Sequence, residues 1–574
     1  MQDREDTTDR LAVAADTGPA DTGPADTGPA DEAAVKRPGG GWRGRGLWAA
    51  GLAVAAVALS WCYLLQARAN PAGSDGAGMA LQGWDMLHGN LLLRGWWTAD
   101  VSFSTFEIPV DALVAGVRGL SADVVHVTAA LVYMALVLVA ALLARGTARG
   151  RAGVIRAVLA AGICVAPSLT ATALLLGPPD HIGVAVPIML TLLLVDRVRA
   201  RWWVPVVVCV LLVWAQLDDP VAEFAAAAPL ALVCLVRAAL GLARDRRGSW
   251  WYDAALAVAA ALSYELTEIA VHAIRAAGGV SMRALSTVTT VMPVAQWGTQ
   301  LLHTGQNLLL LFGAEYWKQP TGLLTAIAYV HLAGVALALC GVVAGIAGLV
   351  RHRDRVTQIL TAATALTLGA GAFITQMQPG FGGSHDIAVA LPFGAVLAGR
   401  AVGSWLARPR APRRRGAARL ALAALLSVAL ACYLAALGYS AAQPAKPAAT
   451  QALADWLVRH HLTSGLARYW TANITTLASG ERVRVAAAGP NPAHPYVWVT
   501  RPSWYDPGQY SANFVIASVA PGNTVYPVSS VQAAFGRPVR QYQVGSYVVM
   551  VYDKNLLRAV SKPVQPNPDT GSRL

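Results

Sequence analysis

Long apolar runs separated by short polar connections are the main pattern along this chain. A helix can cross a lipid bilayer when about twenty consecutive residues are mostly apolar. Runs of this kind predict an α-helical polytopic membrane protein with about eleven transmembrane helices. The expected spans cover residues 47–66, 122–144, 154–176, 182–197, 203–217, 221–240, 251–273, 322–350, 357–376, 386–405 and 418–438.

A polar segment precedes the first apolar run. Residues 1–46 include three copies of the pentapeptide Asp-Thr-Gly-Pro-Ala at positions 16–30. A repeat of this low complexity, rich in Pro and Gly, is too polar to form a packed core. We therefore expect residues 1–46 to be a disordered cytoplasmic tail, and residues 47–440 to form the transmembrane domain.

Two of the connections between the expected spans are long. The first, 67–121, contains a Trp-rich amphipathic stretch at 79–97 that is too polar to span and is expected to lie along the membrane surface. The second, 277–320, contains a mostly apolar run near 291–312. That run predicts a helix that lies on the surface or re-enters the membrane.

The C-terminal part of the chain has a different periodicity. Residues 450–460 predict an amphipathic helix, and several later segments alternate apolar and polar residues with the period of two that is typical of strands. These segments are 482–485, 496–500, 513–519 and 546–552. We therefore expect residues 441–574 to form a small extracytoplasmic α/β domain that ends in a disordered tail.

Composition supports a membrane protein and argues against a nucleic-acid partner. Hydrophobic residues make up 55% of the 574 residues and charged residues 13%, whereas an ordinary soluble domain has about 25% charged residues. The net charge of +13 resides in arginines between apolar runs, without the interleaved aromatic residues of a nucleic-acid groove. The abundance of Ala, Gly, Val and Arg is typical of a GC-rich bacterial genome.

The placement of the arginines predicts the orientation in the membrane. They cluster in every second connection and are sparse in the connections between. Because Lys and Arg accumulate on the cytoplasmic side, we expect a cytoplasmic N-terminus and a C-terminal domain outside the plasma membrane. The arginine-rich connections lie at 36–45, 145–156, 197–201, 237–247, 351–355 and 400–419.

Carboxylates and imidazoles concentrate on the outer side, which predicts an outward-facing cavity beneath the C-terminal domain. Charged groups are costly inside a bilayer and gather where a site faces water or substrate. The candidates in the first outer connection are Asp75, Asp85, Asp100 and Glu107, and those at the outer ends of other spans are Asp180, His181, His385 and Asp386. Spacing places Glu265, Glu268 and His272 on one helical face, where they are possible ligands of a divalent metal.

Each candidate also has an ordinary structural explanation. Asp85 suits the polar face of a surface helix, Asp75 a Gly-rich loop and Asp100 a turn. The glutamates Glu107 and Glu265 suit the interface and a polar helix end. Asp386 suits a helix N-cap, and the same applies to the Asp180–His181 pair. The aromatic residues of the C-terminal domain suit either a core or a sugar-stacking surface.

The first outer connection resembles that of GT-C membrane glycosyltransferases. The similar segments are 81–97 and 100–110, and the segment 385–398 is similar to a late GT-C helix that continues to a Pro. The family includes protein O-mannosyltransferases and the lipid A aminoarabinose transferase. Two features differ from the family pattern: Asp75, followed by Gly, stands nearest to the usual acidic pair, and Ile387-Ala388 replaces an Arg-Tyr pair.

The resemblance implies an enzyme that transfers a sugar from a polyprenyl-phosphate donor to a glycan, lipid or protein of the cell envelope. Such a transfer needs a general base near the acceptor hydroxyl and positive charge near the leaving phosphate. A carboxylate of the first outer connection could be the base, and Asp100 is slightly favoured. The candidate phosphate ligands are Arg94, Arg275, Arg283 and Lys318.

Two other functions remain open from the sequence. A transporter or flippase of an envelope precursor usually carries charge near the membrane midplane and has broken helices in repeated halves. This sequence has almost no charge at the middle of its expected spans and no internal repeat among them. A non-catalytic GT-C-like scaffold is compatible with the two departures from the family pattern. No phosphate-binding motif occurs in the short cytoplasmic connections, so nucleotide chemistry on that side is not expected.

Overall fold

The structure is a computed structural model that describes residues 41–98, 101–178, 180–244, 250–280, 290–319, 321–349, 354–374, 377–408, 413–518 and 525–563. The chain forms two compact units, Met1–Gly51 and Leu52–Leu574. Most of the expected N-terminal tail and the end of the C-terminal tail lie outside the described residues. The sheet, the candidate site and all the helices discussed below except the start of α1 belong to the second unit.

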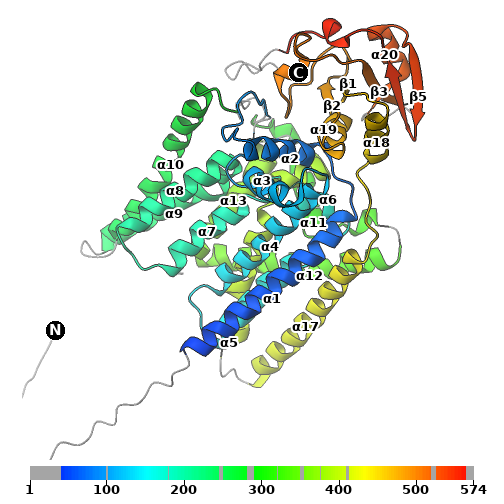
Figure 1. Cartoon of the computed structure of the whole chain (residues 1–574). Helices are drawn as coiled ribbons and strands as arrows, with labels where there is room; N and C mark the ends of the chain where they lie inside the picture. The colour runs from blue at the N-terminus through cyan, green and yellow to red at the C-terminus, as the bar shows by residue number, and fades with distance from the viewer. Residues whose placement is uncertain are drawn as a thin grey trace, which may run out of the picture. The chain divides into compact units, whose positions relative to one another are not determined.

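Each of the eleven apolar runs expected to span contains a helix (Figure 1). These helices are α1 (Gly41–Arg68), α4 (Asp123–Arg145), α5 (Gly150–Cys164), α7 (Ala185–Arg197), α8 (Trp203–Asp218), α9 (Ala228–Arg244), α10 (Trp250–Ala276), α12 (Leu323–Gly348), α13 (Arg355–Phe373), α15 (Ala390–Ala398) and α17 (Arg413–Ala441). Two π-helical turns, η1 (Glu223–Ala227) and η6 (Gly399–Gly403), adjoin α9 and α15, and the short α16 (Ser404–Ala407) follows η6.

Eight segments among the described residues are long and apolar enough to cross a membrane, which confirms the membrane class. The helix α8 is apolar but shorter, and the number eleven remains a prediction. The expected span 154–176 is interrupted, because α5 ends at Cys164. Pro167 follows shortly, and a proline both lacks the backbone N–H and disfavours helical geometry before it.

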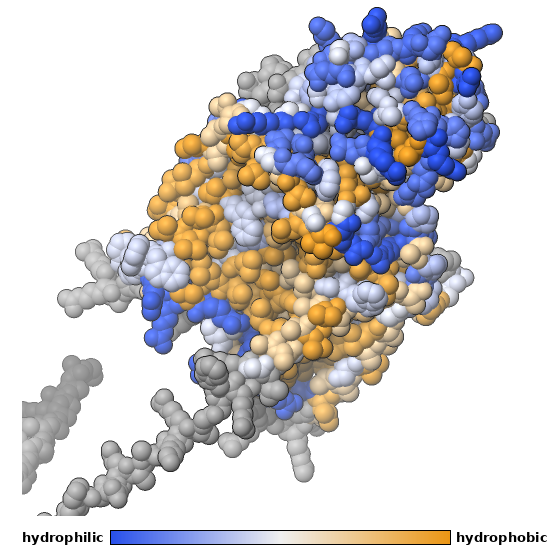
Figure 2. Space-filling model, viewed as in Figure 1, coloured by the Kyte–Doolittle hydropathy of each residue, from blue (hydrophilic) through white to orange (hydrophobic). Residues whose placement is uncertain are grey.

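The helices share an apolar interior and keep an apolar exterior. Tyr63, Leu136 and Phe393 are fully buried between helices, whereas large apolar side chains of α10 and α17 stay exposed. A helix that is apolar all round is typical of a membrane span. Figure 2 shows hydrophobic residues over the helical part and hydrophilic residues over the sheet-containing part.

Short helices lie in the connections on the side of the sheet. The connection 67–121, expected on the outer side and called the first outer connection below, contains α2 (Ser74–Leu87) and α3 (Glu107–Arg118). Later connections contain α6 (Thr172–Leu175), η3 (Val294–Gln296), α11 (Trp297–Leu311), η4 (Tyr316–Lys318), α14 (Phe381–Ser384) and η5 (His385–Ile387). The amphipathic stretch expected at 79–97 is therefore helical only in its first part. The run expected near 291–312 contains α11, whose apolar side chains Leu301 and Leu302 are exposed.

The C-terminal part contains a six-stranded mixed sheet with the order β2-β1-β3-β6-β5, and β4 pairs with β3. The strands β1, β2, β3 and β4 pair in parallel, whereas β6 is antiparallel to β3 and β5. The elements are α18 (Gln451–Arg459), β1 (Ser464–Arg468), α19 (Tyr469–Ala478), β2 (Arg484–Ala488), η7 (Pro502–Tyr505), β3 (Phe514–Ser518), β4 (Tyr526–Pro527), α20 (Val528–Phe535), β5 (Arg540–Val544), β6 (Tyr547–Val551) and η8 (Leu556–Ala559).

One expected strand has a different role. Residues 496–500 form no strand. Instead, Trp97 of the first outer connection and Thr500 of the C-terminal part with the sheet (residues 451–559, called the sheet domain below) exchange two backbone hydrogen bonds of 2.9 Å. Met79 and Trp96 of that connection share one buried cluster with Trp504 of the sheet domain. The sheet domain therefore holds α2 in position, and α2 carries the first residue of the candidate site.

Candidate functional site

Asp75 lies in the first turn of α2 and is held by the sheet domain. The Tyr469 hydroxyl donates a hydrogen bond of 2.5 Å to its carboxylate, and the Ser74 hydroxyl donates one of 2.6 Å to the Tyr469 carbonyl. Burial raises the pKa of Asp75 to about 6, although the Tyr469 hydrogen bond opposes this rise. A carboxylate with such a pKa can accept a proton near neutral pH.

A histidine and an aspartate from two different connections form a second part of the site. His181, which adopts a left-handed backbone with φ of 53°, follows α6, and Asp219 follows α8. Their side chains lie 2.7 Å apart, from Nδ1 to Oδ2. Burial lowers the pKa of His181, but the Asp219 and Asp180 carboxylates raise it more, so the pKa lies well above its ordinary value.

A third connection brings His385 against His181. The two imidazole rings stack with centroids 5.1 Å apart and an angle of 11° between their planes. The neighbouring Asp386 carboxylate lies 3.3 Å from His385 Nε2. One potential ligand atom from each of Asp180, His181 and His385 lies within 4.8 Å of the others.

This arrangement fits a divalent cation. His181 Nδ1 faces Asp219, so a proton on Nδ1 leaves Nε2 free to coordinate, and Nε2 lies 3.6 Å from Asp180 Oδ1. An imidazole ligand of a metal commonly donates its other N–H to a carboxylate in this way. A proton on Nε2 and a cation exclude each other, because both need the same lone pair. Either the proton or the cation places positive charge beside Asp180.

Glu107 and Asp218 form a buried carboxyl pair beside Asp219. The backbone N–H groups of Thr105 and Phe106 donate hydrogen bonds of 3.1 and 2.8 Å to Asp218 Oδ1. Burial, and then the neighbouring Asp218, raise the pKa of Glu107 well above its ordinary value. The pair attaches the start of α3 to the end of α8 and favours a protonated Glu107.

Asp85 and Arg94 lie in a different part of the first outer connection. Asp85 accepts hydrogen bonds of 2.6 Å from Asn90 Nδ2 and 2.9 Å from Trp96 Nε1, and Arg501 lies 3.4 Å away. The backbone N–H of Arg94 donates to Asn90 Oδ1, and the Arg94 side chain is exposed. These contacts give Asp85 a role in attaching the connection to the sheet domain.

The remaining candidates fall into two groups, those outside the described residues and those on α10. Asp100 and Arg283, and the side chain of Lys318, lie outside the described residues. Glu265, Glu268 and His272 are exposed along α10, and His272 Nδ1 lies 2.8 Å from the Glu268 carbonyl. Arg275 occupies the last turn of α10. The roles suggested for these residues stay predictions.

The charges of Asp180 and His385 act on the pKa of Asp75, the first raising it and the second lowering it. The structure thus brings together Asp75, Asp180, His181, His385 and Asp386 from the candidates named by sequence. It adds Asp219 and Tyr469, which sequence reasoning had not placed in the site. The Asp-Asp-Pro sequence at 218–220 in an outer connection was a signal for Asp219. Tyr469 is one of the clustered aromatic residues that suit either a core or a sugar-stacking surface, but no local signal indicated its contact with Asp75, because that contact depends on where the sheet domain docks.

Comparisons with known proteins bear on the fold. Neither a protein-family model nor a curated protein sequence matches the chain. The structure of ArnT from Cupriavidus metallidurans bound to undecaprenyl phosphate is similar, with a TM-score of 0.51, 12% identity, and coverage of 89% of this chain and 98% of ArnT. The structure of the oligosaccharyltransferase of Archaeoglobus fulgidus matches with a TM-score of 0.48 and 14% identity. The match covers 83% of this chain and 70% of the oligosaccharyltransferase. The likeness to ArnT confirms the expected GT-C membrane fold.

Proposed function

We propose that this protein is a glycosyltransferase that transfers a sugar from a polyprenyl-phosphate donor to a hydroxyl group of a cell-envelope glycan, lipid or protein. The observation that carries the proposal is the convergence of Asp75 with Asp180, His181 and His385 from three distant segments. The chain shares the fold of ArnT, whose structure is described as bound to undecaprenyl phosphate. That likeness supports a lipid-linked donor.

Asp75 is the proposed general base. Its carboxylate takes the proton of the acceptor hydroxyl while the hydroxyl oxygen attacks the anomeric carbon of the sugar. The bond between that carbon and the phosphate oxygen breaks, and the polyprenyl phosphate leaves with the bonding electrons. Negative charge then grows on the phosphate, and the positive charge held at His181 offsets it. Tyr469 orients the base through its 2.5 Å hydrogen bond.

A divalent cation held by Asp180, His181 and His385 is part of the proposal. Such a cation would supply Lewis-acid stabilisation of the leaving phosphate. We expect EDTA to lower the transfer rate about tenfold or more and Mn²⁺ to restore it. The reason is that Lewis-acid stabilisation by a metal ion contributes several kcal/mol. Calorimetry should also detect Mn²⁺ binding to the wild type but not to an Asp180→Asn/His385→Gln variant. Full transfer in EDTA would argue against a metal and leave the His181 imidazolium in that role.

The pH dependence of transfer should report the ionisation of Asp75. Asp75 is active as a base when ionised, so the rate should rise as the pH increases through about 6. The Tyr469 hydrogen bond lowers the pKa of Asp75; therefore Tyr469→Phe should move this rise to higher pH, by about one unit for a lost hydrogen bond to a charged group. The measurement is a pH profile of kcat/KM.

Tyr510→Phe is the control for this pH experiment, because Tyr510 stacks with Arg484 elsewhere in the sheet domain. We expect its profile to match that of the wild type. An unshifted pH profile in Tyr469→Phe would mean that the ionisation of Asp75 does not control the rise in rate at acidic pH.

The proposal places the reaction on the outer side of a bacterial plasma membrane, with the sheet domain outside and the N-terminus in the cytoplasm. The arginine clusters of the connections on the opposite side support this orientation. The six native cysteines all lie at or before Cys432, so a Ser561→Cys variant adds the first thiol to the sheet domain. A membrane-impermeant maleimide should label it in intact cells, and protection from the reagent would contradict the orientation.

Two alternative functions predict different behaviour of the purified protein in lipid vesicles. A transferase releases polyprenyl phosphate and glycosylates the acceptor, and mass spectrometry detects both products. Donor that stays bound without turnover would identify a non-catalytic scaffold. Donor that crosses the vesicle membrane without transfer would identify a flippase.

A further inference from the structure

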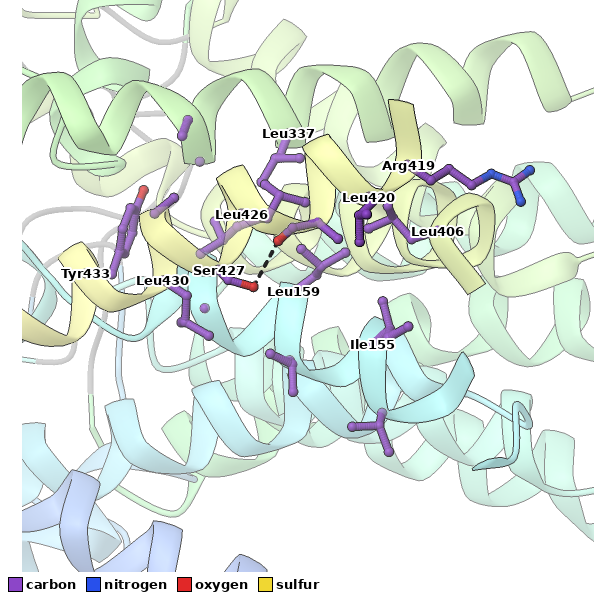
Figure 3. A pocket seen from close by; sticks show the side chains of 18 of the residues that line it. Ile155, Leu159, Leu337, Leu406, Arg419, Leu420, Leu426, Ser427, Leu430 and Tyr433 are labelled. Atoms are coloured by element: carbon purple, nitrogen blue, oxygen red, sulfur yellow. Dashed lines mark hydrogen bonds between the residues drawn. The ribbon is translucent and has the colours of Figure 1, made fainter. Parts of the chain in front are cut away.

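A cavity of about 680 Å³ lies among α5, α12, α16 and α17 (Figure 3). None of its lining residues belongs to the candidate catalytic site. Its volume falls in the range of about 300–1,000 Å³ that is common for ligand pockets. Leu159 of α5, Leu337 of α12, and Leu426 and Leu430 of α17 contribute to its walls. In Figure 3, Tyr433 lies at one end of the cavity and Arg419 at the other.

Most polar groups of the cavity lie at the end that contains Arg419, called the arginine end below. Arg151, Arg408 and Arg419 line it, and none of the described lining residues is acidic. Arg419 Nη1 donates a hydrogen bond of 2.8 Å to the Arg408 carbonyl, whereas Arg419 Nε is buried without a hydrogen-bond partner in the described part of the chain. The cavity therefore combines an apolar interior with concentrated positive charge at one end.

The arginine end lies at the opposite end of α5 from the candidate catalytic site. Arg151 stands in the first turn of α5, and the connection that follows Cys164 leads to Asp180 and His181. Likewise, Arg419 lies near the start of α17, whose other end leads to the sheet domain. The positive charge of the cavity thus belongs to the membrane side that carries the arginine clusters.

The cavity can receive a ligand from the bilayer. Few of the described residues of α17 are buried, so this helix packs loosely over α5 and α12. Leu420, Leu425 and Val428 of α17 are exposed, as expected for side chains that meet lipid. A ligand that fills the space beneath α17 needs apolar chains and an anionic head group at the depth of the membrane interface.

We propose that this cavity binds one anionic glycerophospholipid from the leaflet on the arginine-rich side, with its acyl chains between α5, α12 and α17 and its phosphate at Arg151, Arg408 and Arg419. Basic pockets between transmembrane helices on the cytoplasmic side are suited to anionic head groups. The charge complementarity selects an anionic over a zwitterionic lipid. The site is separate from the donor site, and the proposal does not depend on glycosyl transfer.

Native mass spectrometry of the purified full-length protein tests this proposal, with palmitoyl-oleoyl phosphatidylglycerol and the matching phosphatidylcholine as probes. We expect one phosphatidylglycerol to bind about tenfold more tightly than phosphatidylcholine. An Arg151→Gln/Arg419→Gln variant should lose about thirtyfold in phosphatidylglycerol affinity, because two basic residues near a head group contribute about 1 kcal/mol each. The Arg199→Gln/Arg201→Gln variant is the charge-matched control, since both arginines are exposed outside the cavity.

A second pair of variants tests the apolar part without changing charge. Ala423 lines the cavity, whereas Ala424 is exposed and does not. Ala423→Phe should reduce lipid occupancy, and Ala424→Phe should not. Equal affinity of the two lipids, equal losses in the two arginine pairs, or equal occupancy in the two Phe variants would overturn the proposal. Preferential binding of undecaprenyl phosphate in competition with phosphatidylglycerol would also overturn it.

Discussion

The Asp75→Asn variant is expected to transfer sugar about 10²–10⁴ times more slowly than the wild type, because a positioned general base contributes a factor of that size. Asn keeps the shape of the side chain and can still pair with Tyr469, but it cannot accept the acceptor proton. The donor does not need the base in order to bind, so donor affinity should change little. This pattern, a lower kcat with similar binding, is typical of a group that acts in the transition state.

The assay for Asp75 is single-turnover transfer from a polyprenyl-phosphate sugar, with donor binding measured separately. Asp455→Asn is the matched control, because Asp455 is an exposed aspartate of α18 whose Oδ1 accepts a hydrogen bond from Gln451. It should retain the wild-type rate. A wild-type rate in Asp75→Asn would remove the proposed base and would return Asp100 to consideration.

The Arg400→Met variant is expected to lower the free energy of unfolding by about 3–5 kcal/mol, the usual cost of removing one partner from a buried ion pair. Arg400 is only 7% exposed. Its guanidinium lies 2.8 Å from Asp196 and 2.9 Å from Asp354, and it donates a hydrogen bond of 2.7 Å to the Leu143 carbonyl. Its loss therefore leaves the buried Asp196 carboxylate and the Leu143 carbonyl without this partner, whereas Asp354 keeps its hydrogen bond with Thr357. It also disconnects α4, α7, α13 and η6.

Equilibrium unfolding in mixed micelles with increasing SDS measures this loss of stability. Arg199→Met removes an arginine from the same side of the membrane domain, but its side chain is exposed. The stability of that control should change by about 0.5 kcal/mol or less. Equal destabilisation by the two substitutions would show that the buried network does not hold the helices together.

The candidate site was only partly predictable from sequence. Asp180, His181 and His385 were recognised as polar residues at the outer ends of spans, since charge is costly within the membrane. Their mutual distances were not predictable, because they depend on the packing of helices that are far apart in the chain. Asp85 and Asp75 are both candidates for the base by sequence, yet Asp85 pairs with Asn90, Trp96 and Arg501, whereas Asp75 contacts Tyr469.

The sequence by itself determined the membrane class, the positions of the apolar helices and the mixed helix-and-strand character of the C-terminal part. These properties follow from local composition and periodicity, which act over one element at a time. Only the tertiary structure decided that Tyr469 reaches Asp75, that His181 stacks on His385, and that α17 leaves a cavity beside α5. The physical reason is that such contacts join residues separated by long stretches of chain, and local pattern carries no information about how those stretches pack together.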